Sequence, residues 1–309
     1  MLLTFSVLIA LIIDLFVGEP RRWHPLVGFG NVANGLENTL NNVPNKSPFL
    51  SRLKGLVAWC LLILPIVILL WLFEQQVLST QANIILGIAC LTFAIGTKSL
   101  MQHARAVANA LKESDLLQAR KKIAMIVSRD TSSSDETAIN KATIESVLEN
   151  GSDAIFAAIF WFAVLGAPGV VLYRLANTLD AMWGYRTERY NTFGWAAARI
   201  DDGLNWLPAR LTALSYALAG NIRSALSSWK NQAKFWHGIN PGVVMASGAG
   251  ALNVKLGGAA IYHGENIKRP ELGCDNTAQV ADIDRSIQLV NKSIIIWLLV
   301  ITVGDYFIV

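Results

Sequence analysis

Apolar runs long enough to enter a membrane alternate with charged stretches along this chain. The clearest run is Leu56 to Phe73, which contains a single proline. A helix rises about 1.5 Å per residue and a bilayer core is about 30 Å thick, so roughly 20 apolar residues are needed to cross it. The pattern predicts seven segments at or near the membrane: 2–17, 56–73, 84–97, 154–173, 204–220, 243–262 and 293–309, of which 204–220 and 243–262 are weak. We therefore expect an all-α, polytopic integral membrane helical bundle with amphipathic or re-entrant helices and sizeable cytoplasmic loops.

The segment 154–173 is broken near its C-terminal third by Gly166-Ala167-Pro168-Gly169. A simple span would put the following arginines outside the cell, against the tendency of basic loops to stay inside. A re-entrant hairpin that turns at the Gly-Pro cluster removes this conflict, because irregular backbone is tolerated at membrane depth where protein buries it. We favour the hairpin over the simple span.

The loops carry the basic residues, as expected for a cytoplasmic orientation. Residues 18–55 read as a loop that opens with the turn Gly18-Glu19-Pro20 and contains Arg21, Arg22, Lys46, Arg52 and Lys54. Residues 102–126 read as an amphipathic helix whose basic cluster fits contact with anionic membrane lipid. Asp14, at the end of the first run, is either a functional carboxylate or a group at the membrane boundary.

Composition supports this picture and excludes other classes. The chain has 309 residues, of which 53% are hydrophobic and only 16% charged, with a mean hydropathy of +0.42. The net charge of +4 comes from scattered loop residues, so we expect no nucleic-acid partner. The three cysteines form no CxxC pair, which argues against a disulfide framework or a zinc site. Without a convincing repeat or linker, one integral membrane domain covering 1–309 is the simplest expectation.

A polar stretch from Ser128 to Asp153 lies directly before the apolar run that begins at Ala154. Within it Glu145, Glu149 and Asp153 are spaced i, i+4, i+8, which places three carboxylates on one helix stripe. Like charges at this spacing repel unless cations offset them. The stripe is either a solvated helix face or a site for a divalent metal, since Mg²⁺ prefers hard oxygen ligands.

A second polar cluster follows between residues 177 and 210, interleaved with aromatic residues. Its acids and amides recur with a mostly helical spacing, and the arginines beside them either neutralise the acids or bind an anion. The cluster comprises Asn177, Asp180, Arg199, Asp201, Asp202, Asn205 and Arg210. Neither cluster contains a GxxxxGK[ST] phosphate loop, and the chain has no HExxH or GxSxG motif.

Several of these stretches resemble one known family. They are DLFVGEPRRWHP at 14–25, SRDT at 128–131, IESVLEN at 144–150, FW at 160–161 and the long block at 177–214. They are similar to the CobD/CbiB family of cobalamin-biosynthesis membrane proteins, adenosylcobinamide-phosphate synthases. The resemblance implies an acid-amine ligase of the cell inner membrane. Such an enzyme joins adenosylcobyric acid to (R)-1-amino-2-propanol or its O-phosphate, using ATP and Mg²⁺ and no bound prosthetic group.

The implied chemistry assigns roles to residues of both clusters. We expect a catalytic group of Arg129, Asp130, Glu149, Asn150 and Arg199. Substrate binding is expected at Asn177, Asp180, Asn205, Arg210 and Asn240, and metal binding at Glu145, Glu149, Asp153, Asp201 and Asp202. Partners include membrane lipid, and both a homo-oligomer and a complex with other late cobalamin-pathway enzymes are left open.

Three departures and two alternatives accompany the resemblance. The family usually has SPNAG where this chain reads Gly238-Ile239-Asn240-Pro241-Gly242. Leu148 stands where alanine is common, and a third departure is Ala158-Ile159 in place of the usual Pro-Leu before Phe160-Trp161; we interpret these two as packing changes. A small-molecule transporter would use Asp14 and the broken segment, but it should show two related halves. A non-catalytic regulator, similar to the β-lactamase-induction membrane protein, would not need so many acids, arginines and amides together.

Overall fold

The computed structural model describes residues 2–18, 25–41, 47–185, 187–262 and 265–308. Helices dominate, and four of the described helical stretches are long and apolar enough to cross a membrane: Pro48–Gln76, Thr80–Lys112, Glu136–Trp183 and Val280–Phe307. The expected polytopic helical class is therefore confirmed. The described chain divides into two compact units, each made of separate sequence segments.

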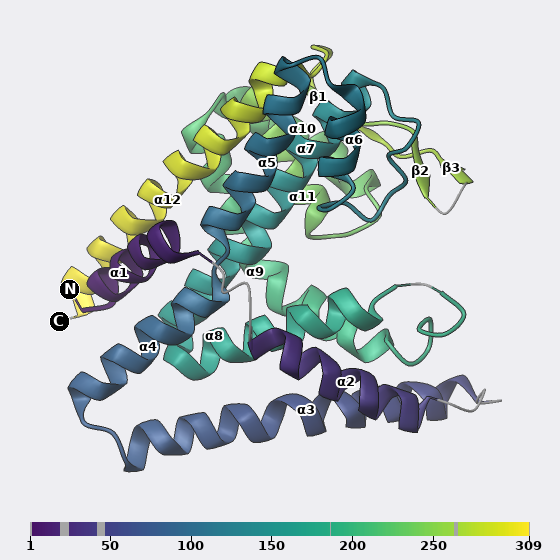
Figure 1. Ribbon diagram of the computed structural model, residues 1–309. Coiled ribbons are helices and arrows are strands. Elements are labelled where there is room, and N and C mark those ends of the chain that lie inside the picture. The colour runs from purple at the N-terminus through teal and green to yellow at the C-terminus, as the bar shows by residue number, and fades with distance from the viewer. Residues whose placement is uncertain (1, 19–24, 42–46, 186, 263–264, 309) are drawn as a thin grey trace. The chain divides into compact units, whose positions relative to one another are not determined.

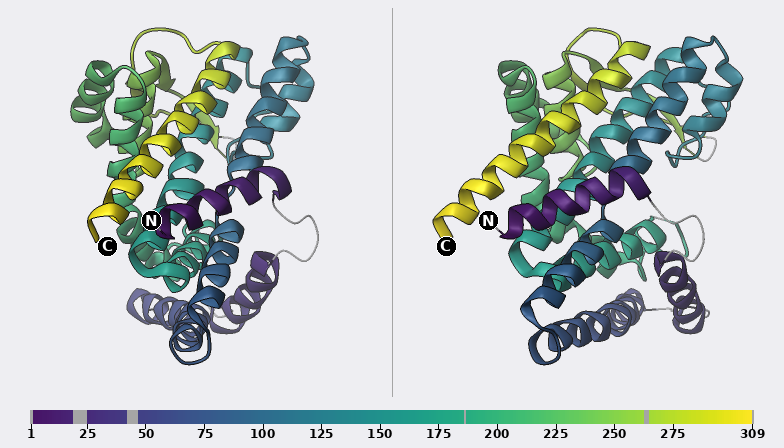
Figure 2. Two further views of the ribbon diagram at one scale, coloured as in Figure 1. Left: turned by 90° about the vertical axis from the view of Figure 1, so that its left-hand side faces the viewer. Right: turned by 60° about the vertical axis from the view of Figure 1, so that its left-hand side comes forward.

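The first unit comprises residues 96–156 and 206–309. It contains α5 (Thr97–Lys112), α6 (Leu116–Ile123), α7 (Glu136–Gly151), the π-helical turn η1 (Ser152–Phe156) and the C-terminal part of α9 (Trp195–Ala219). After these come α10 (Ile222–Gln232), the 3₁₀ turn η2 (Ala233–Phe235), α11 (Pro241–Leu252) and α12 (Val280–Ile308). The helix α7 packs against α5, α11 and α12, and α10 packs on α11 (Figures 1 and 2).

Four short strands lie between α11 and α12. Strand β1 (Lys255–Gly257) pairs antiparallel with β4 (Glu271–Gly273), and β2 (Ala260–Tyr262) pairs antiparallel with β3 (Glu265–Ile267). Gly257 at the end of β1 has φ +72°, a conformation that glycine adopts without steric cost. The weak span predicted at 243–262 is wrong, because α11 ends at Leu252, where Asn253 takes the left-handed conformation, and strands follow.

The cap residues explain where several helices of this unit begin. The Asp135 side chain accepts a hydrogen bond from the Ala138 backbone N–H and starts α7. The residues predicted as one amphipathic helix over 102–126 form two helices instead. Ser114 has φ 60° and Asp115 caps α6, so the chain turns sharply between α5 and α6. Leu148 of α7 fills the space beside Gly248 of α11, which agrees with its interpretation as a packing residue.

The second unit comprises residues 2–95 and 157–205. Its helices are α1 (Leu2–Val17), α2 (Pro25–Leu40), α3 (Pro48–Gln76), α4 (Thr80–Ala94), α8 (Ala157–Trp183) and the first part of α9. The helices α3 and α4 both pack on α8, and α1 packs on α4. The expectation of a loop over 18–55 is wrong where α2 and the start of α3 lie. Glu19 and Pro20 of its predicted opening turn and three of its basic residues, Arg21, Arg22 and Lys46, fall outside the described residues.

The predicted break in segment 154–173 is present. Gly166 has φ 66° and ψ −149°, which is not helical, and a side chain at Gly169 would clash with the Trp161 carbonyl oxygen. Eight residues of straight helix would separate those positions by about 12 Å, so the chain bends back sharply at Gly166. The re-entrant position of this bend in a membrane stays a prediction.

The other predicted spans agree with the helices to different degrees. Segments 2–17 and 56–73 coincide with α1 and part of α3, and 84–97 overlaps α4. Segment 293–309 is the second part of α12, which begins earlier, at Val280. The helix α9 covers 204–220 but is not among the described helices apolar enough to cross a membrane. The expectation of one membrane domain stays a prediction.

Candidate active site

The centre of the candidate site is a buried ion cluster on α7. The carboxylate of Glu145, only 5% exposed, accepts a hydrogen bond from Arg129 Nη2 at 3.0 Å and from Arg269 Nη1 at 3.1 Å. It also accepts the backbone N–H of Gly257 at 2.8 Å. Buried charges persist only where such partners satisfy them. Glu145 therefore fixes two arginine side chains that come from distant segments of the chain.

Each partner reaches Glu145 for a local structural reason. Arg129 lies in the non-helical stretch before α7, and Arg269 follows the β2–β3 hairpin. The turn at Gly257 carries its N–H toward α7, while the Arg269 guanidinium lies over the Trp236 ring at 5.1 Å and donates from Nε to the Gly258 carbonyl. Stacking and hydrogen bonding together hold this guanidinium in one orientation.

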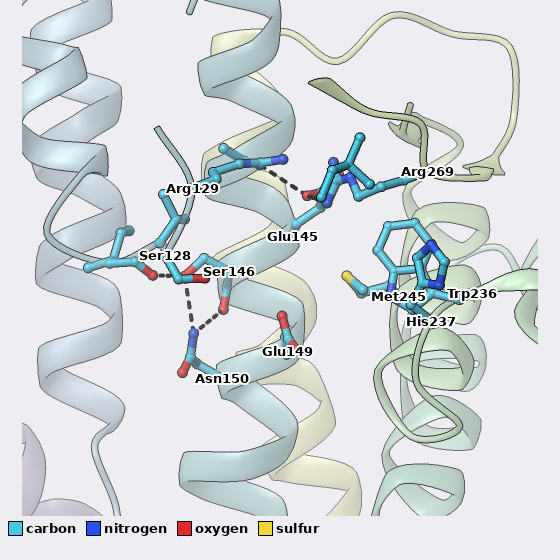
Figure 3. A pocket seen from close by; sticks show the side chains of 14 residues that line it. Ser128, Arg129, Glu145, Ser146, Glu149, Asn150, Trp236, His237, Met245 and Arg269 are labelled. Carbon is cyan, nitrogen blue, oxygen red and sulfur yellow. Dashed lines mark hydrogen bonds and ion pairs between the residues drawn. The ribbon is translucent and has the colours of Figure 1, made fainter. Parts of the chain in front are cut away.

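A cavity of about 370 Å³ opens beside this cluster, and we call it the arginine pocket (Figure 3). Its polar lining combines Arg129 and Arg269 with carboxylate, amide and hydroxyl groups of α7, and its apolar lining includes Trp236 and Met245. A few fixed polar groups on an otherwise apolar wall are typical of small-molecule sites. The lining of the arginine pocket includes Glu145, Ser146, Glu149, Asn150 and His237.

Glu149 lies one helical turn after Glu145 and points into the arginine pocket (Figure 3). Among the residues that the structure describes, no hydrogen bond or ion pair engages its carboxylate. On the same wall Asn150 donates to the Ser146 carbonyl at 2.9 Å and to its hydroxyl at 3.1 Å. The pocket thus presents one carboxylate with open lone pairs beside two arginines that are already positioned.

The predicted catalytic residues divide between the two units. Arg129, Glu149 and Asn150 line the arginine pocket. Asp130 lies just beyond it, where hydrogen bonds from the backbone and side chain of Ser132 hold the pKa of its carboxyl below the usual range. Arg199 belongs to the second unit, where it pairs with Asp202 at 3.2 Å on an exposed face of α9.

The second cluster forms a hydrogen-bonded network between α8 and α9. Asp201 accepts from Asn177 at 3.3 Å and from Asn205 at 2.9 Å, and Tyr173 donates to Asn205 at 2.9 Å. Burial is the main reason that the pKa of Asp201 rises to about 6, although the two amide hydrogen bonds act in the opposite direction. Asp180 of α8 lies near enough to this group to feel the charges of Asp201 and Asp202.

Two predicted substrate-binding residues meet in the first unit. Arg210 donates to the Asn240 side chain at 3.1 Å and to the Trp206 carbonyl at 2.6 Å, and it lies over the Trp206 ring at 4.2 Å. Asn240 is buried and precedes α11. The altered segment 238–242 therefore supports the start of α11, and neither Arg210 nor Asn240 lines the arginine pocket.

The predicted metal ligands do not assemble in the way the stripe suggested. Among the described residues, no group of three or more His, Cys, Asp or Glu side chains is placed to hold a metal ion. Glu145 is engaged by arginines, Asp153 is half-buried in η1, and Asp201 and Asp202 belong to the other unit. Of the stripe, Glu149 is the member that faces the arginine pocket with its carboxylate open.

Sequence reasoning missed Arg269, Trp236, His237 and Lys141 as site residues. Arg269, Trp236 and His237 lie outside both polar clusters recognised in the sequence. The available signal was the charge of Glu145: a carboxylate on a mostly apolar helix face requires cationic partners, and a basic residue far along the chain can supply one as well as Arg129 or Lys141 can.

A mostly helical protein with membrane-length apolar helices is, by class, a membrane-associated helical protein, and this one has a charged cavity on one helical unit. Comparison with known proteins narrows this class. The family described as CobD/Cbib protein matches residues 7–290. The chain belongs to this family, whose curated relatives are named for cobalamin biosynthesis.

The relatives cover nearly the whole chain. A "Cobalamin biosynthesis protein CobD" of Stutzerimonas stutzeri (strain A1501) is 53% identical over 301 residues, 97% of each chain. A protein of the same name from Chromobacterium violaceum is 53% identical over 291 residues, 94% of this chain and 92% of the relative. A "Probable cobalamin biosynthesis protein CobD" of Methanothermobacter thermautotrophicus is 37% identical over 261 residues, 82% of this chain and 84% of the relative. No solved structure matches the chain significantly.

Proposed function

We propose that this protein catalyses formation of an amide between adenosylcobyric acid and (R)-1-amino-2-propanol or its O-phosphate, with ATP as the energy source. The relatives' names support a place in cobalamin biosynthesis. The observation that carries the proposal is the open carboxylate of Glu149 beside two arginines that Glu145 holds in place. One pocket then offers a base and anion-binding groups together.

The proposed chemistry proceeds in two steps. A carboxylate oxygen of the corrinoid attacks the terminal phosphorus of ATP, the bond from that phosphorus to ADP breaks, and an acyl phosphate forms. The amine nitrogen then attacks the acyl carbon, an amide bond forms, and the C–O bond to phosphate breaks. The arginines offset negative charge on the transferred phosphoryl group, and Glu149 accepts the proton that the amine nitrogen loses.

Magnesium enters the proposal as part of the nucleotide complex. The described residues offer no ready three-ligand group for a resident ion, and Mg²⁺ commonly keeps several waters and uses one or two carboxylates together with substrate phosphates. Glu149 and Asp130 are the carboxylates of this unit that could complete such a shell. In this proposal the arginines stabilise the transferred phosphoryl group and Glu149 accepts the proton, so the ion has no separate role in either step.

The proposed setting is the cytoplasmic face of the cell inner membrane. ATP is a cytoplasmic substrate, and the stretch that carries Arg129 is rich in basic residues on its N-terminal side. The proposed partners of the protein are the corrinoid, the aminopropanol substrate and membrane lipid. Assembly as a homo-oligomer or with other late-pathway enzymes stays a prediction.

A matched pair of variants tests the proposal. The purified protein in detergent should convert adenosylcobyric acid and the amine to amide with release of ADP, and Glu149→Gln should lower turnover by about 10²- to 10⁴-fold. Glu136→Gln, an exposed position on the same helix, should leave turnover unchanged. Near-normal turnover in Glu149→Gln would remove this carboxylate from the chemistry, and a wild-type protein without ATP-dependent amide formation would end the proposal.

A further inference from the structure

A second cavity of about 450 Å³, which we call the lysine pocket, lies on the same unit. Its walls are the stretch before α7, the first turns of α7 and the glycine turn between β1 and β2. It shares Arg129 and Arg269 with the arginine pocket. The two cavities therefore adjoin on either side of the buried ion cluster at Glu145.

Lys141 is the distinctive group of the lysine pocket. It is half-buried on α7, and no hydrogen bond or ion pair engages its ammonium among the described residues. Its Nζ lies beside the glycine turn, 3.9 Å from the position that a Cβ atom on Gly258 would occupy. Three hydroxyl side chains, those of Ser133, Ser134 and Thr137, line the same cavity. An unpaired ammonium among hydroxyl donors is suited to an oxyanion.

The acidic residues around this cavity are already engaged. Asp135 accepts the Ala138 N–H as the cap of α7, and Asp130 accepts the Ser132 N–H. Glu271 pairs with Lys255 at 3.2 Å. Glu271 thus has a cationic partner, and Asp130 and Asp135 are exposed and accept hydrogen bonds from backbone N–H groups. Among the described residues, no carboxylate pairs with the ammonium of Lys141.

We propose that the lysine pocket binds the polyphosphate chain of the nucleoside triphosphate, with Lys141 as a direct phosphate contact. This inference rests on the proposed function and divides its site in two. The terminal phosphate would lie at the shared arginines, and the reacting carboxylate and amine would occupy the arginine pocket beyond them. The volume falls within the range of known ligand sites. The walls carry Lys141 and the two shared arginines as well as Asp130, Asp135 and Glu271, so the cationic groups are the ones suited to contact an anionic phosphate chain.

Nucleotide binding by the full-length protein tests this division. The protein would be placed in nanodiscs of zwitterionic lipid, and the Kd of a non-hydrolysable ATP analogue with Mg²⁺ measured by equilibrium titration. Lys141→Gln should raise this Kd by about 10- to 100-fold, since a hydrogen bond to a charged group contributes about 1.5–3 kcal/mol. Lys141→Arg should recover part of the affinity. Lys121→Gln, an equal charge change at an exposed position of α6, should have no effect.

Binding of two other anionic ligands, aminopropanol O-phosphate and vesicles with anionic lipid, distinguishes nucleotide binding from the alternatives. The Kd of aminopropanol O-phosphate should stay within about twofold of wild type in Lys141→Gln. A loss of affinity for that phosphate alone, or for vesicles with anionic lipid alone, would overturn the inference, as would unchanged nucleotide affinity. Wild-type protein that binds no nucleotide would reject the proposed function itself. An unchanged unfolding midpoint is expected for Lys141→Gln, because the ammonium makes no contact that folding requires.

Discussion

Removal of the negative charge at Glu145 should destabilise the first unit strongly. Glu145→Gln would leave two guanidinium groups, with side chains 10% and 8% exposed, without the carboxylate that forms an ion pair with both. An uncompensated buried charge costs about 3–5 kcal/mol. The glutamine can still accept the Gly257 N–H through its single carbonyl oxygen, so we expect a loss of about 3–5 kcal/mol in the free energy of unfolding.

Removal of one arginine should cost less. In Arg129→Gln the Glu145 carboxylate keeps the Arg269 guanidinium and the Gly257 N–H, so a loss of about 1–3 kcal/mol is expected. In the double variant the cluster retains one uncompensated cation instead of two. The loss in the free energy of unfolding of the double variant Arg129→Gln/Glu145→Gln should therefore be smaller than the sum of the two single losses, by about 1–3 kcal/mol.

Denaturant titration of the purified protein, followed by helical circular dichroism, would measure these differences. Glu136→Gln serves as the control, because this exposed residue of α7 should change stability by no more than about 0.5 kcal/mol. Additivity of Arg129→Gln and Glu145→Gln within about 0.5 kcal/mol would refute the reasoning, since it would mean that the two side chains do not act on each other.

Three further predictions concern other parts of the chain. The folded pKa of Asp201, about 6, exceeds the usual value near 4, so its contribution to stability is present below about pH 4 and lost as pH rises through 6. The part of this loss that falls between pH 5 and pH 8 is about 1–1.5 kcal/mol. Asp201→Asn should remove it in unfolding titrations at these two pH values, and an unchanged pH profile would contradict this prediction. Gly166→Ala should lower the free energy of unfolding by about 1–3 kcal/mol, because φ 66° with ψ −149° suits only glycine. The control Gly203→Ala, in helix α9 with open space around it, should be neutral or stabilising. Equal effects of the two substitutions in thermal unfolding would be evidence against strain at the bend. Cysteines introduced at Ser134 and Thr187 should both react with a membrane-impermeant thiol reagent from the cytoplasmic side. Bound nucleotide should protect only the cysteine at position 134. Labelling of the two positions from opposite sides would refute a cytoplasmic location for both.

The sequence was most informative where one physical effect dominated. Apolar runs predicted α1, α3 and α4 because burial in lipid outweighs other preferences over such lengths. The Gly-Pro cluster predicted the bend at Gly166 because no other residue adopts its backbone angles readily. These features follow from local composition, so they can be recognised without knowledge of distant contacts.

The sequence was less informative where tertiary contacts decide. Residues 25–40 contain several glycines and asparagines and were interpreted as a loop, yet they form α2, whose contacts include an ion pair between Glu37 and Arg189. The strands β1 to β4 are three residues each, too short for any periodic pattern to appear.

The carboxylate stripe on α7 shows the same limit at the site. Spacing placed Glu145 and Glu149 on one face, and Glu149 does face the arginine pocket. Spacing could not reveal that Glu145 is saturated by Arg129 and Arg269, because the latter is 124 residues away. The partners of a charge, rather than its position on a helix, decide whether it is available to a ligand.

That separation of 124 residues also sets when the pocket can exist during synthesis. At about 5–20 residues per second, a ribosome takes roughly 6–25 s to pass from Glu145 to Arg269. During this interval Glu145 has emerged with only one of its two arginines, and α7 lacks the glycine turn that completes its wall. A chain released before Arg269 is made would contain the apolar helices of the second unit but not an assembled binding site. The ion cluster therefore cannot assemble, and the pocket cannot be competent, until the ribosome has passed Arg269.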